Sequence, residues 1–245
     1  MTTQEFKNEF LIHYNAIATN SAPGLDDFEI SVFLTKAQLE LVKNNYKTDG
    51  NKYREGFEGS EKRRVDLREL VKDYKSTLIV TSTSKIHTNS QFFKIPDDVF
   101  LIVYEDVTIS TTDCYNGNIL NVNVKTHDEF TIQIDNPFKK PDQNICWRLD
   151  FSKIGSDRVV ELINPYTISQ YHLRYIMYPP PIIVSALSAS FPGEGLTIDG
   201  ISVSQTCVLD KELHREIVDR AVQLALRDYK PANLESKISL DLRNE

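Results

Sequence analysis

Hydrophobic residues recur with a helical period at the start of the chain and with a period of two in its middle. In residues 4–20 the large apolar side chains are mostly three or four positions apart, which predicts an amphipathic helix. After a break at residues 21–24, helices are expected over about residues 27–46 and residues 62–74. The polar stretch 48–59, which contains three glycines, predicts an exposed loop between them.

In the middle of the chain, short stretches rich in Val, Ile, Thr and aromatic residues alternate between apolar and polar positions. The expected strands are residues 77–83, 92–95, 99–112, 121–124, 130–134, 145–151 and 171–178. Residues 125–129 are expected at the tip of a hairpin, and the pairs Asn136-Pro137 and Asn164-Pro165 each end a strand. Six or seven short strands with frequent turns indicate a β-sandwich or a small β-barrel.

The order of elements is helices first, strands next and a helix last, which predicts an α+β fold and not an alternating α/β fold. The C-terminal helix is expected to pack on the N-terminal helices, so that the β module is inserted into one helical bundle. The expected parts are an N-terminal helical part (1–75), a β-sandwich or barrel module (76–181), an extended arm or extra strands (182–208), the C-terminal helix (209–229) and a C-terminal tail (230–245).

Composition narrows the class of protein. Hydrophobic residues make up 40% and charged residues 26% of the 245, as in a folded globular chain. The net charge of -7 argues against a dedicated nucleic-acid reader, because affinity for phosphates comes from clustered Lys and Arg, but it allows a protein that surrounds nucleic acid without gripping it. No signal-peptide core and no membrane-length apolar stretch is present, which predicts a soluble protein made inside a cell. Cys114, Cys146 and Cys207 are scattered, and each is expected to be a small buried residue in a reducing compartment.

The C-terminal helix, which is expected to begin at Asp210, carries several residues of the types that could form a site. His214, however, lies in the apolar arc of the helix, away from Glu212 and Glu216. Asp210, the expected N-cap, is the only acidic residue three or four positions from it, so His214 is interpreted as a core or interface histidine and not as a ligand. Two pairs with i, i+4 spacing, Arg215 with Asp219 and Glu216 with Arg220, indicate an ordinary charged helix face.

Other candidate residues favour structural roles. His13, His87, His127 and His172 are dispersed and show no metal-ligand spacing, and no nucleotide-binding or nucleophile motif occurs. The basic segment 61–64 with Arg68 is interpreted as a solvated or ion-paired helix start, with phosphate binding as the alternative. Trp147 is expected in the core, Asp97 and Asp98 in a turn, and Asp26 or Asp27 at a helix cap. The sequence therefore predicts no catalytic, cofactor-binding or metal-binding residues, no cofactor and no enzyme activity.

Four segments resemble the head-to-tail connector proteins of tailed bacteriophages. They are 33–42 (FLTKAQLELV), 171–184 (YHLRYIMYPPPIIV), 196–203 (LTIDGISV) and 207–225 (CVLDKELHREIVDRAVQLA). The order of helices and strands is similar to that of the adaptor or tail tubular A family of short-tailed phages. The sequences of these four segments most resemble the ring proteins of crAss-like phages. The resemblance implies a virion protein, made in the cytoplasm of the host bacterium, with a β module inserted into a helical bundle.

The same resemblance implies a ring of copies, commonly twelve, that docks beneath the portal protein and other tail proteins. The genome DNA would pass through its channel without sequence-specific binding, and no membrane is involved. The loop 48–61, the arm around 185–205 and the tail 230–245 are the parts expected to reach neighbouring copies. Two alternatives stay open: a β-sandwich module of the tail that binds a receptor or glycan, and an uncharacterised hydrolase built from scattered carboxylates.

Overall fold

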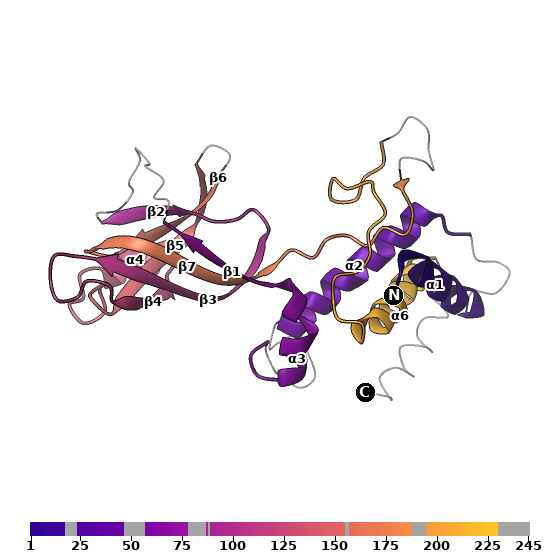
Figure 1. The fold of residues 1–245 in the computed structure, drawn as a ribbon, viewed down its shortest axis with the longest axis horizontal. Helices are drawn as coiled ribbons and strands as arrows, with labels where there is room; N and C mark the ends of the chain where they lie inside the picture. Colours follow the sequence, from indigo (N-terminus) through magenta and orange to yellow (C-terminus); the bar gives the residue numbers. More distant parts are fainter. Residues whose placement is uncertain are drawn as a thin grey trace. The chain divides into compact units, whose positions relative to one another are not determined.

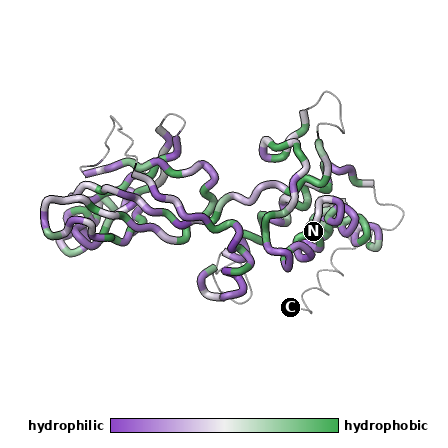
Figure 2. Tube along the Cα trace, viewed as in Figure 1, coloured by the Kyte–Doolittle hydropathy of each residue, from purple (hydrophilic) through white to green (hydrophobic). Residues whose placement is uncertain are grey.

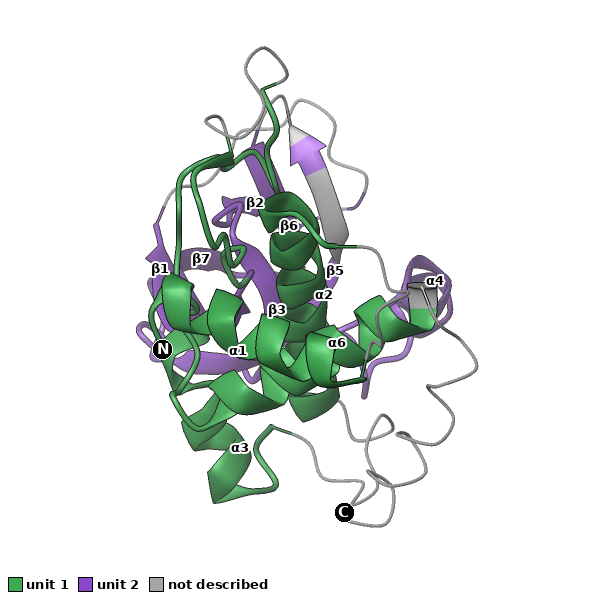
Figure 3. Ribbon diagram, turned by 90° about the vertical axis from the view of Figure 1, so that its right-hand side faces the viewer, with its two compact units in different colours: residues 1–70, 179–245 green, residues 71–178 purple. Residues whose placement is uncertain are grey.

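The structure is a computed structural model, and it describes residues 1–17, 24–46, 57–77, 87, 89–154, 157–187 and 195–229. It divides into a helical unit, formed by Met1–Leu70 with Pro179–Glu245, and a β unit, Val71–Tyr178 (Figure 3). Both ends of the chain belong to the helical unit, and the β unit is inserted between them in sequence. The predicted α+β fold, with helices and a β module, is confirmed.

Three helices form the core of the helical unit: α1 (Thr3–Ile17), α2 (Asp27–Tyr46) and α6 (Leu213–Tyr229). α6 packs on both α1 and α2 (Figure 1). Hydrophobic and hydrophilic residues alternate along α1 and α6 (Figure 2), because each of these helices buries one side, whereas α2 is buried around most of its circumference. The apolar side chains that fill this core include Phe6, Phe10, Tyr14, Ile30, Leu34, Leu213, Ile217, Val218, Ala221 and Ala225.

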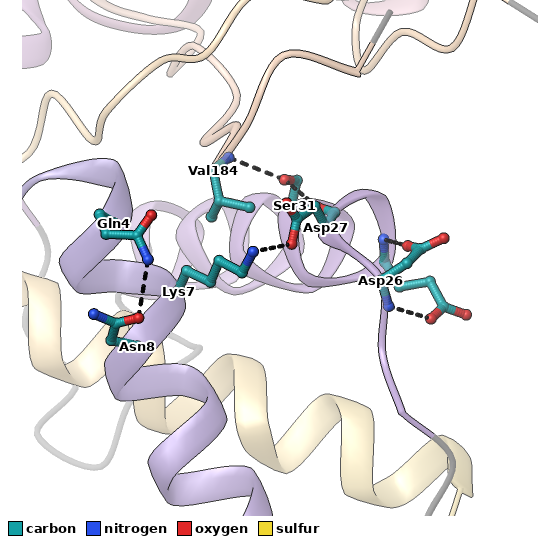
Figure 4. Close-up of polar contacts among 8 residues, drawn as sticks. Gln4, Lys7, Asn8, Asp26, Asp27, Ser31 and Val184 are labelled. Carbon is teal, nitrogen blue, oxygen red and sulfur yellow. Dashed lines mark hydrogen bonds and ion pairs between the residues drawn. The ribbon is translucent and has the colours of Figure 1, made fainter. Parts of the chain in front are cut away.

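The start of α2 is held by a reciprocal pair of hydrogen bonds that Figure 4 shows beside the contact with α1. Asp26 Oδ1 accepts a hydrogen bond from the backbone N–H of Glu29 at 2.7 Å, and Glu29 Oε2 accepts one from the N–H of Asp26 at 3.1 Å. This arrangement is a capping box, in which two otherwise unpaired donors are satisfied. Lys7 of α1 lies 2.7 Å from Asp27, so the predicted cap also lies at a helix contact.

The third predicted helix is shorter than expected. α3 spans Glu61–Asp66, a 3-10 turn η1 spans Arg68–Leu70, and strand β1 follows at Val71–Ser76. The prediction of helix up to residue 74 is therefore wrong at its end. The local pattern fits either period, and pairing of β1 with strand β7 selects the extended form.

The β unit is one seven-stranded mixed sheet in the order β1-β7-β3-β4-β5-β6-β2 (Figure 1). The strands after β1 are β2 (Ser90–Lys94), β3 (Val99–Ser110), β4 (Ile119–Val124), β5 (Ile145–Ile154), β6 (Asp157–Ile163) and β7 (Thr167–Met177). Residues from six of them enclose a core that includes Phe93, Val107, Leu120, Cys146, Leu162, Tyr171 and Leu173, and a second, smaller cluster contains Phe130, Trp147, Leu149 and Ile163. Only β4 and β5 run parallel among the paired strands of the described chain.

The hairpin expected around residues 125–129 is wrong. Helix α4 (His127–Gln133) stands there, and the Thr126 side chain caps it by accepting a hydrogen bond from Glu129 N–H. The reason is topological: β4 and β5 are parallel, and a parallel pair needs a crossover connection. The strand expected at residues 77–83 lies outside the described residues, apart from Thr77.

Candidate interaction surfaces

His214, the residue that first suggested a site, is a buried structural residue. Its ring is 4% exposed and lies 5.1 Å from the ring of Phe6. Nε2 is 3.0 Å from the carbonyl oxygen of Leu209, and Nδ1 is 2.8 Å from the α-amino nitrogen of Met1. Burial lowers the pKa of His214, so the neutral imidazole is favoured, with Nε2–H donating to Leu209. As predicted, it is a core histidine.

The charged face of α6 binds the neighbouring helices. Arg220 Nε lies 2.7 Å from Glu40 Oε2 of α2, and Asp219 Oδ1 lies 2.9 Å from His13 Nδ1 of α1. Asp219 and Arg220, which were expected to pair along α6, thus also connect helices. Beside them a shallow pocket of about 290 Å³ opens between α1 and α6, lined by Glu9, Ile12, His13, Arg215, Val218 and Asp219.

A row of polar side chains on α2 holds residues 180–187, which include the start of the arm. Ser31, Thr35 and Gln38 follow one another at spacings of four and three, so they share one helix face. The hydroxyl of Thr35 accepts the N–H of Ile182 at 3.2 Å, and that of Ser31 accepts the N–H of Val184 at 3.1 Å. The amide of Gln38 donates to the carbonyl of Pro180 at 3.3 Å. We call these three side chains the α2 ladder.

The α2 ladder is buried, and its side chains bond to backbone groups of the extended segment in the way that the backbone of a neighbouring strand would. Ser31, Thr35 and Gln38 are at most 6% exposed, and Ile182 and Ile183 are fully buried. Successive arm residues bond to different partners. The backbone N–H of Ile182 bonds to Thr35 of α2, whereas Ile183 exchanges two backbone hydrogen bonds with Gln205. Arm residues 182–187 were expected as strands or as an arm; they form an extended segment with isolated bridges, fixed to a helix.

The returning half of the arm contains a tight turn at Ile198–Ile201. Asp199 and Gly200 have φ angles of 51° and 80°, and Ile198 and Ile201 exchange both backbone hydrogen bonds. Positive φ at both central positions is the requirement of a type I′ turn, which Asp-Gly satisfies. Val203, next to this turn, is 68% exposed, so the arm offers an apolar side chain on its outer surface.

The connection from β4 to β5 carries the most exposed large apolar side chains of the β unit. Phe138 is 95% exposed and Ile132 is 79% exposed, on the loop after α4 and on α4 itself. Phe138 is held by a turn in which Asn136 Oδ1 accepts its N–H at 3.0 Å. The matching Asn164-Pro-Tyr166 turn uses the same bond at 2.9 Å, so the repeated Asn-Pro pattern reflects one local geometry.

A pocket of about 480 Å³ lies beside this connection. It is lined by His87, Asn89, Phe130, Ile134, Lys140, Pro141, Ile163 and Pro165. The rings of His87 and Phe130 are 3.9 Å apart, and Phe130 also contacts Trp147, which is 1% exposed. Trp147 is therefore a core residue, as predicted, and it supports the floor of a pocket that sequence reasoning missed because α4 was taken for a strand.

The core of the β unit contains an ion pair. Arg148 lies 2.6 Å from Glu105, with side-chain exposures of 9% and 5%. Burial raises the pKa of Glu105 against the opposing attraction of Arg148, and burial together with the Glu105 charge raises the pKa of the adjacent Tyr171 hydroxyl. Neither charge was recognised from the sequence, because each occupies an otherwise ordinary position in a strand.

The remaining candidate residues take structural positions. Arg63, in the basic segment, donates to the carbonyls of Asn44 and Asn45, so it caps the C-terminal end of α2. Asp98 lies in the predicted turn and accepts a hydrogen bond from Tyr175 at 3.0 Å. Cys146 and Cys207 are buried as expected, whereas Cys114 is exposed, which corrects that prediction.

Within the described ranges, no three His, Cys, Asp or Glu side chains come together as a metal site. His13, His127 and His172 lie on different elements; the ring centroids of His87 and His127 are 6.0 Å apart, and His172 contacts Asp106 at 2.9 Å. None of the described helices has the length and hydrophobicity needed to cross a membrane.

Comparison with known proteins shows matches along the whole chain. The profile of the phage tail ring protein 3/4 family matches residues 1–236. Ring protein 4/5 of Bacteroides phage crAss001 is 36% identical over 247 residues, covering 100% of both chains. Ring protein 3 of the same phage is also 36% identical, over 228 residues that cover 92% of this chain and 95% of that protein. The resemblance to ring proteins of crAss-like phages is thereby confirmed.

Proposed function

Because the chain belongs to the phage tail ring protein 3/4 family, we propose that it forms a homo-oligomeric ring in the connector between head and tail. As a member of that family it is a structural tail protein, and this match over nearly the whole chain carries the proposal. The ring would dock beneath the portal protein and other connector proteins, and its channel would let the genome pass. Twelve copies are expected from the resemblance of the sequence to connector proteins.

The surfaces of the chain support a ring of copies. A closed ring needs two different surfaces on each copy, since its contacts are head-to-tail. The arm with exposed Val203 and the β4–β5 connection with exposed Phe138 are two such surfaces on different units. We propose that the arm, residues 182–208, and the tail, residues 230–245, reach neighbouring copies.

The charge of the chain supports passage of DNA without retention. The net charge is -7, and the one basic concentration, residues 61–64, uses Arg63 to cap α2. Binding of DNA phosphates depends on clustered positive charge, so an acidic ring would offer a channel in which DNA slides. We propose no enzyme activity for this ring.

The test is to mix the purified chain with the portal protein of the same phage and to image the mixture by electron microscopy. A ring seated on the portal is the expected result, and counting its subunits decides the copy number. The chain alone serves as the control, because the free protein is expected to stay monomeric until the portal organises it. Absence of any ring, with a monomer persisting at high concentration, contradicts the proposal.

A receptor-binding or glycan-binding module is the second candidate, and the 480 Å³ pocket beside the exposed Phe138 favours it. An apolar pocket with a few polar groups is the usual form of a small-ligand site. The discriminating measurement is binding of the chain to host surface glycans. Binding that is lost in Phe130→Ala, a change in the pocket lining, but retained in Ile119→Ala, a change of an exposed apolar residue that does not line the pocket, would support this candidate over the ring.

A further inference from the structure

Strand β1 leaves one side of the seven-stranded sheet open. It pairs antiparallel with β7 on one side, and in the described chain no strand pairs with its other side. An edge strand exposes a row of backbone N–H and C=O groups, which proteins usually cover or protect. β1 spans six residues, Val71–Ser76, and so can accept a segment of similar length.

The two faces of β1 differ. Tyr74 pairs with Leu173 and packs on the core of the β unit. Asp73 and Lys75 pair with Arg174 and His172 on the opposite face, where both are exposed. A strand that adds to this edge should therefore be apolar on one face and should carry charges opposite to Asp73 and Lys75 on the other.

The C-terminal segment Ile238-Ser-Leu-Asp-Leu-Arg243 has this pattern in its sequence. Ile238, Leu240 and Leu242 alternate with polar residues, which is the period of a strand. Antiparallel pairing of Tyr74 with Leu242 places Arg243 opposite Asp73 and Asp241 opposite Lys75. Asp73 and Lys75 then each meet an opposite charge, while Leu240 and Leu242 lie on the core side.

We infer that residues 240–243 of a second copy bind to β1 as an added eighth strand. Backbone hydrogen bonds would supply affinity, and the alternating side chains would set the register. The donor segment and the acceptor edge are different parts of the chain, so each copy can give one strand and receive another, which is the head-to-tail contact that a ring requires. The inference rests on the proposed ring, and it names one contact that would close it.

Cysteine crosslinking between two chains tests this contact. One chain carries Lys75→Cys and the other Asp241→Cys, both with exposed Cys114 replaced by serine, and the two are mixed with portal under mild oxidation. Directly opposed positions lie close enough for a disulfide, so a crosslinked dimer should appear on a non-reducing gel. The matched control, Asp73→Cys with Asp241→Cys, lies on the same face two positions out of register and should give a severalfold lower yield.

The outcomes separate this inference from the proposed function. No crosslink above the control, whether or not rings form, overturns the strand exchange, and equal yields from both pairs overturn the register. Rings without a crosslink leave the proposed ring intact and remove only this contact. A crosslink without rings supports the exchange and counts against the ring. Reversing both charges, Lys75→Asp with Asp241→Lys, should restore assembly that either single change reduces.

Discussion

The two units bury polar groups in different ways. Besides Asp66, the helical unit buries a row of neutral groups, the Ser31, Thr35 and Gln38 side chains of the α2 ladder, and each bonds to a backbone group of residues 180–184. Besides Glu161, the β unit buries an ion pair in which Arg148 and Glu105 bind each other. A neutral group that loses its partner costs about 1–3 kcal/mol, whereas an uncompensated buried charge costs more. The difference indicates at which residue a single substitution should lower the free energy of unfolding the most.

The largest effect is expected from Arg148→Met. It leaves the Glu105 carboxylate buried without its partner, so the β unit should lose about 3–5 kcal/mol of unfolding free energy. Urea unfolding followed by tryptophan fluorescence measures it, since Trp147 lies in the same unit.

The control for this change is the double variant Arg148→Met with Glu105→Leu. Replacing both charges with apolar groups removes the unpaired carboxylate, so most of the lost stability should return. If the double variant is as unstable as the single one, the loss comes from packing and not from charge.

A smaller loss, of about 1–3 kcal/mol, is expected from Thr35→Val. Valine keeps the shape of threonine but removes the hydroxyl that binds the Ile182 N–H, so a buried donor is left unpaired. Urea unfolding followed by circular dichroism, together with hydrogen exchange of the Ile182 amide, measures this effect. Thr35→Ser keeps the hydroxyl and should retain the protected amide; equal exchange in both variants contradicts the role of the ladder.

The buried His214 of the helical unit gives a pH-dependent test of how a buried polar group contributes to stability. Its folded pKa is lowered by burial, so the folded state binds fewer protons than the unfolded state, in which the pKa is about 6.5. The stability from the neutral ring is therefore present above about pH 6.5 and is lost as the pH falls, by at most about 1.4 kcal/mol per pH unit. Unfolding free energies of wild type and His214→Gln, compared on both sides of that pH, measure it. A stability difference that does not change with pH would contradict the neutral assignment.

The smallest effect is expected at the exposed ion pair between Arg220 and Glu40. Both side chains are more than 40% exposed, so Arg220→Ala should cost between about 0 and 1 kcal/mol. Because salt screens exposed charges, the loss should shrink further at high ionic strength. A salt-independent loss larger than that of Thr35→Val would reverse the ranking of buried and exposed groups.

The sequence predicted α1, α2, α6 and most strands because their periods are local properties. The stripe of Phe6, Phe10 and Tyr14 is buried as the spacing indicated. β6 was missed because Val159–Ile163 is buried on both faces and shows no alternation, and α4 was missed because Phe130–Ile134 fits either period. The parallel pairing of β4 with β5 requires a crossover connection and so accounts for α4. This pairing joins segments that are separated in the sequence, so local periodicity does not predict it.

The candidate surfaces could be predicted only in part. The arm was recognised from its extended pattern, but the α2 ladder was not, because Ser31, Thr35 and Gln38 gain meaning only when residues 180–184 lie against them. Phe138 gives no sequence signal of its exposure. The Arg148–Glu105 pair joins residues 43 positions apart in the chain, and neither has a local reason to be buried.

The α2 ladder joins a helix to an extended segment, whose repeats differ in length, so their bonding groups lie opposite each other over a short stretch only. Four helix residues advance about 6.0 Å and three advance about 4.5 Å, whereas two residues of an extended arm advance about 6.6 Å. These lengths are similar enough for all three ladder bonds to form together, and they join Ser31 to Val184, Thr35 to Ile182 and Gln38 to Pro180. The difference in length accumulates along the two segments, so the ladder stays short. An arm that shifts by two residues so that Pro180 replaces Ile182 opposite Thr35 would lose this hydrogen bond, because proline has no N–H, so the helix can fix the position of the arm without a sheet.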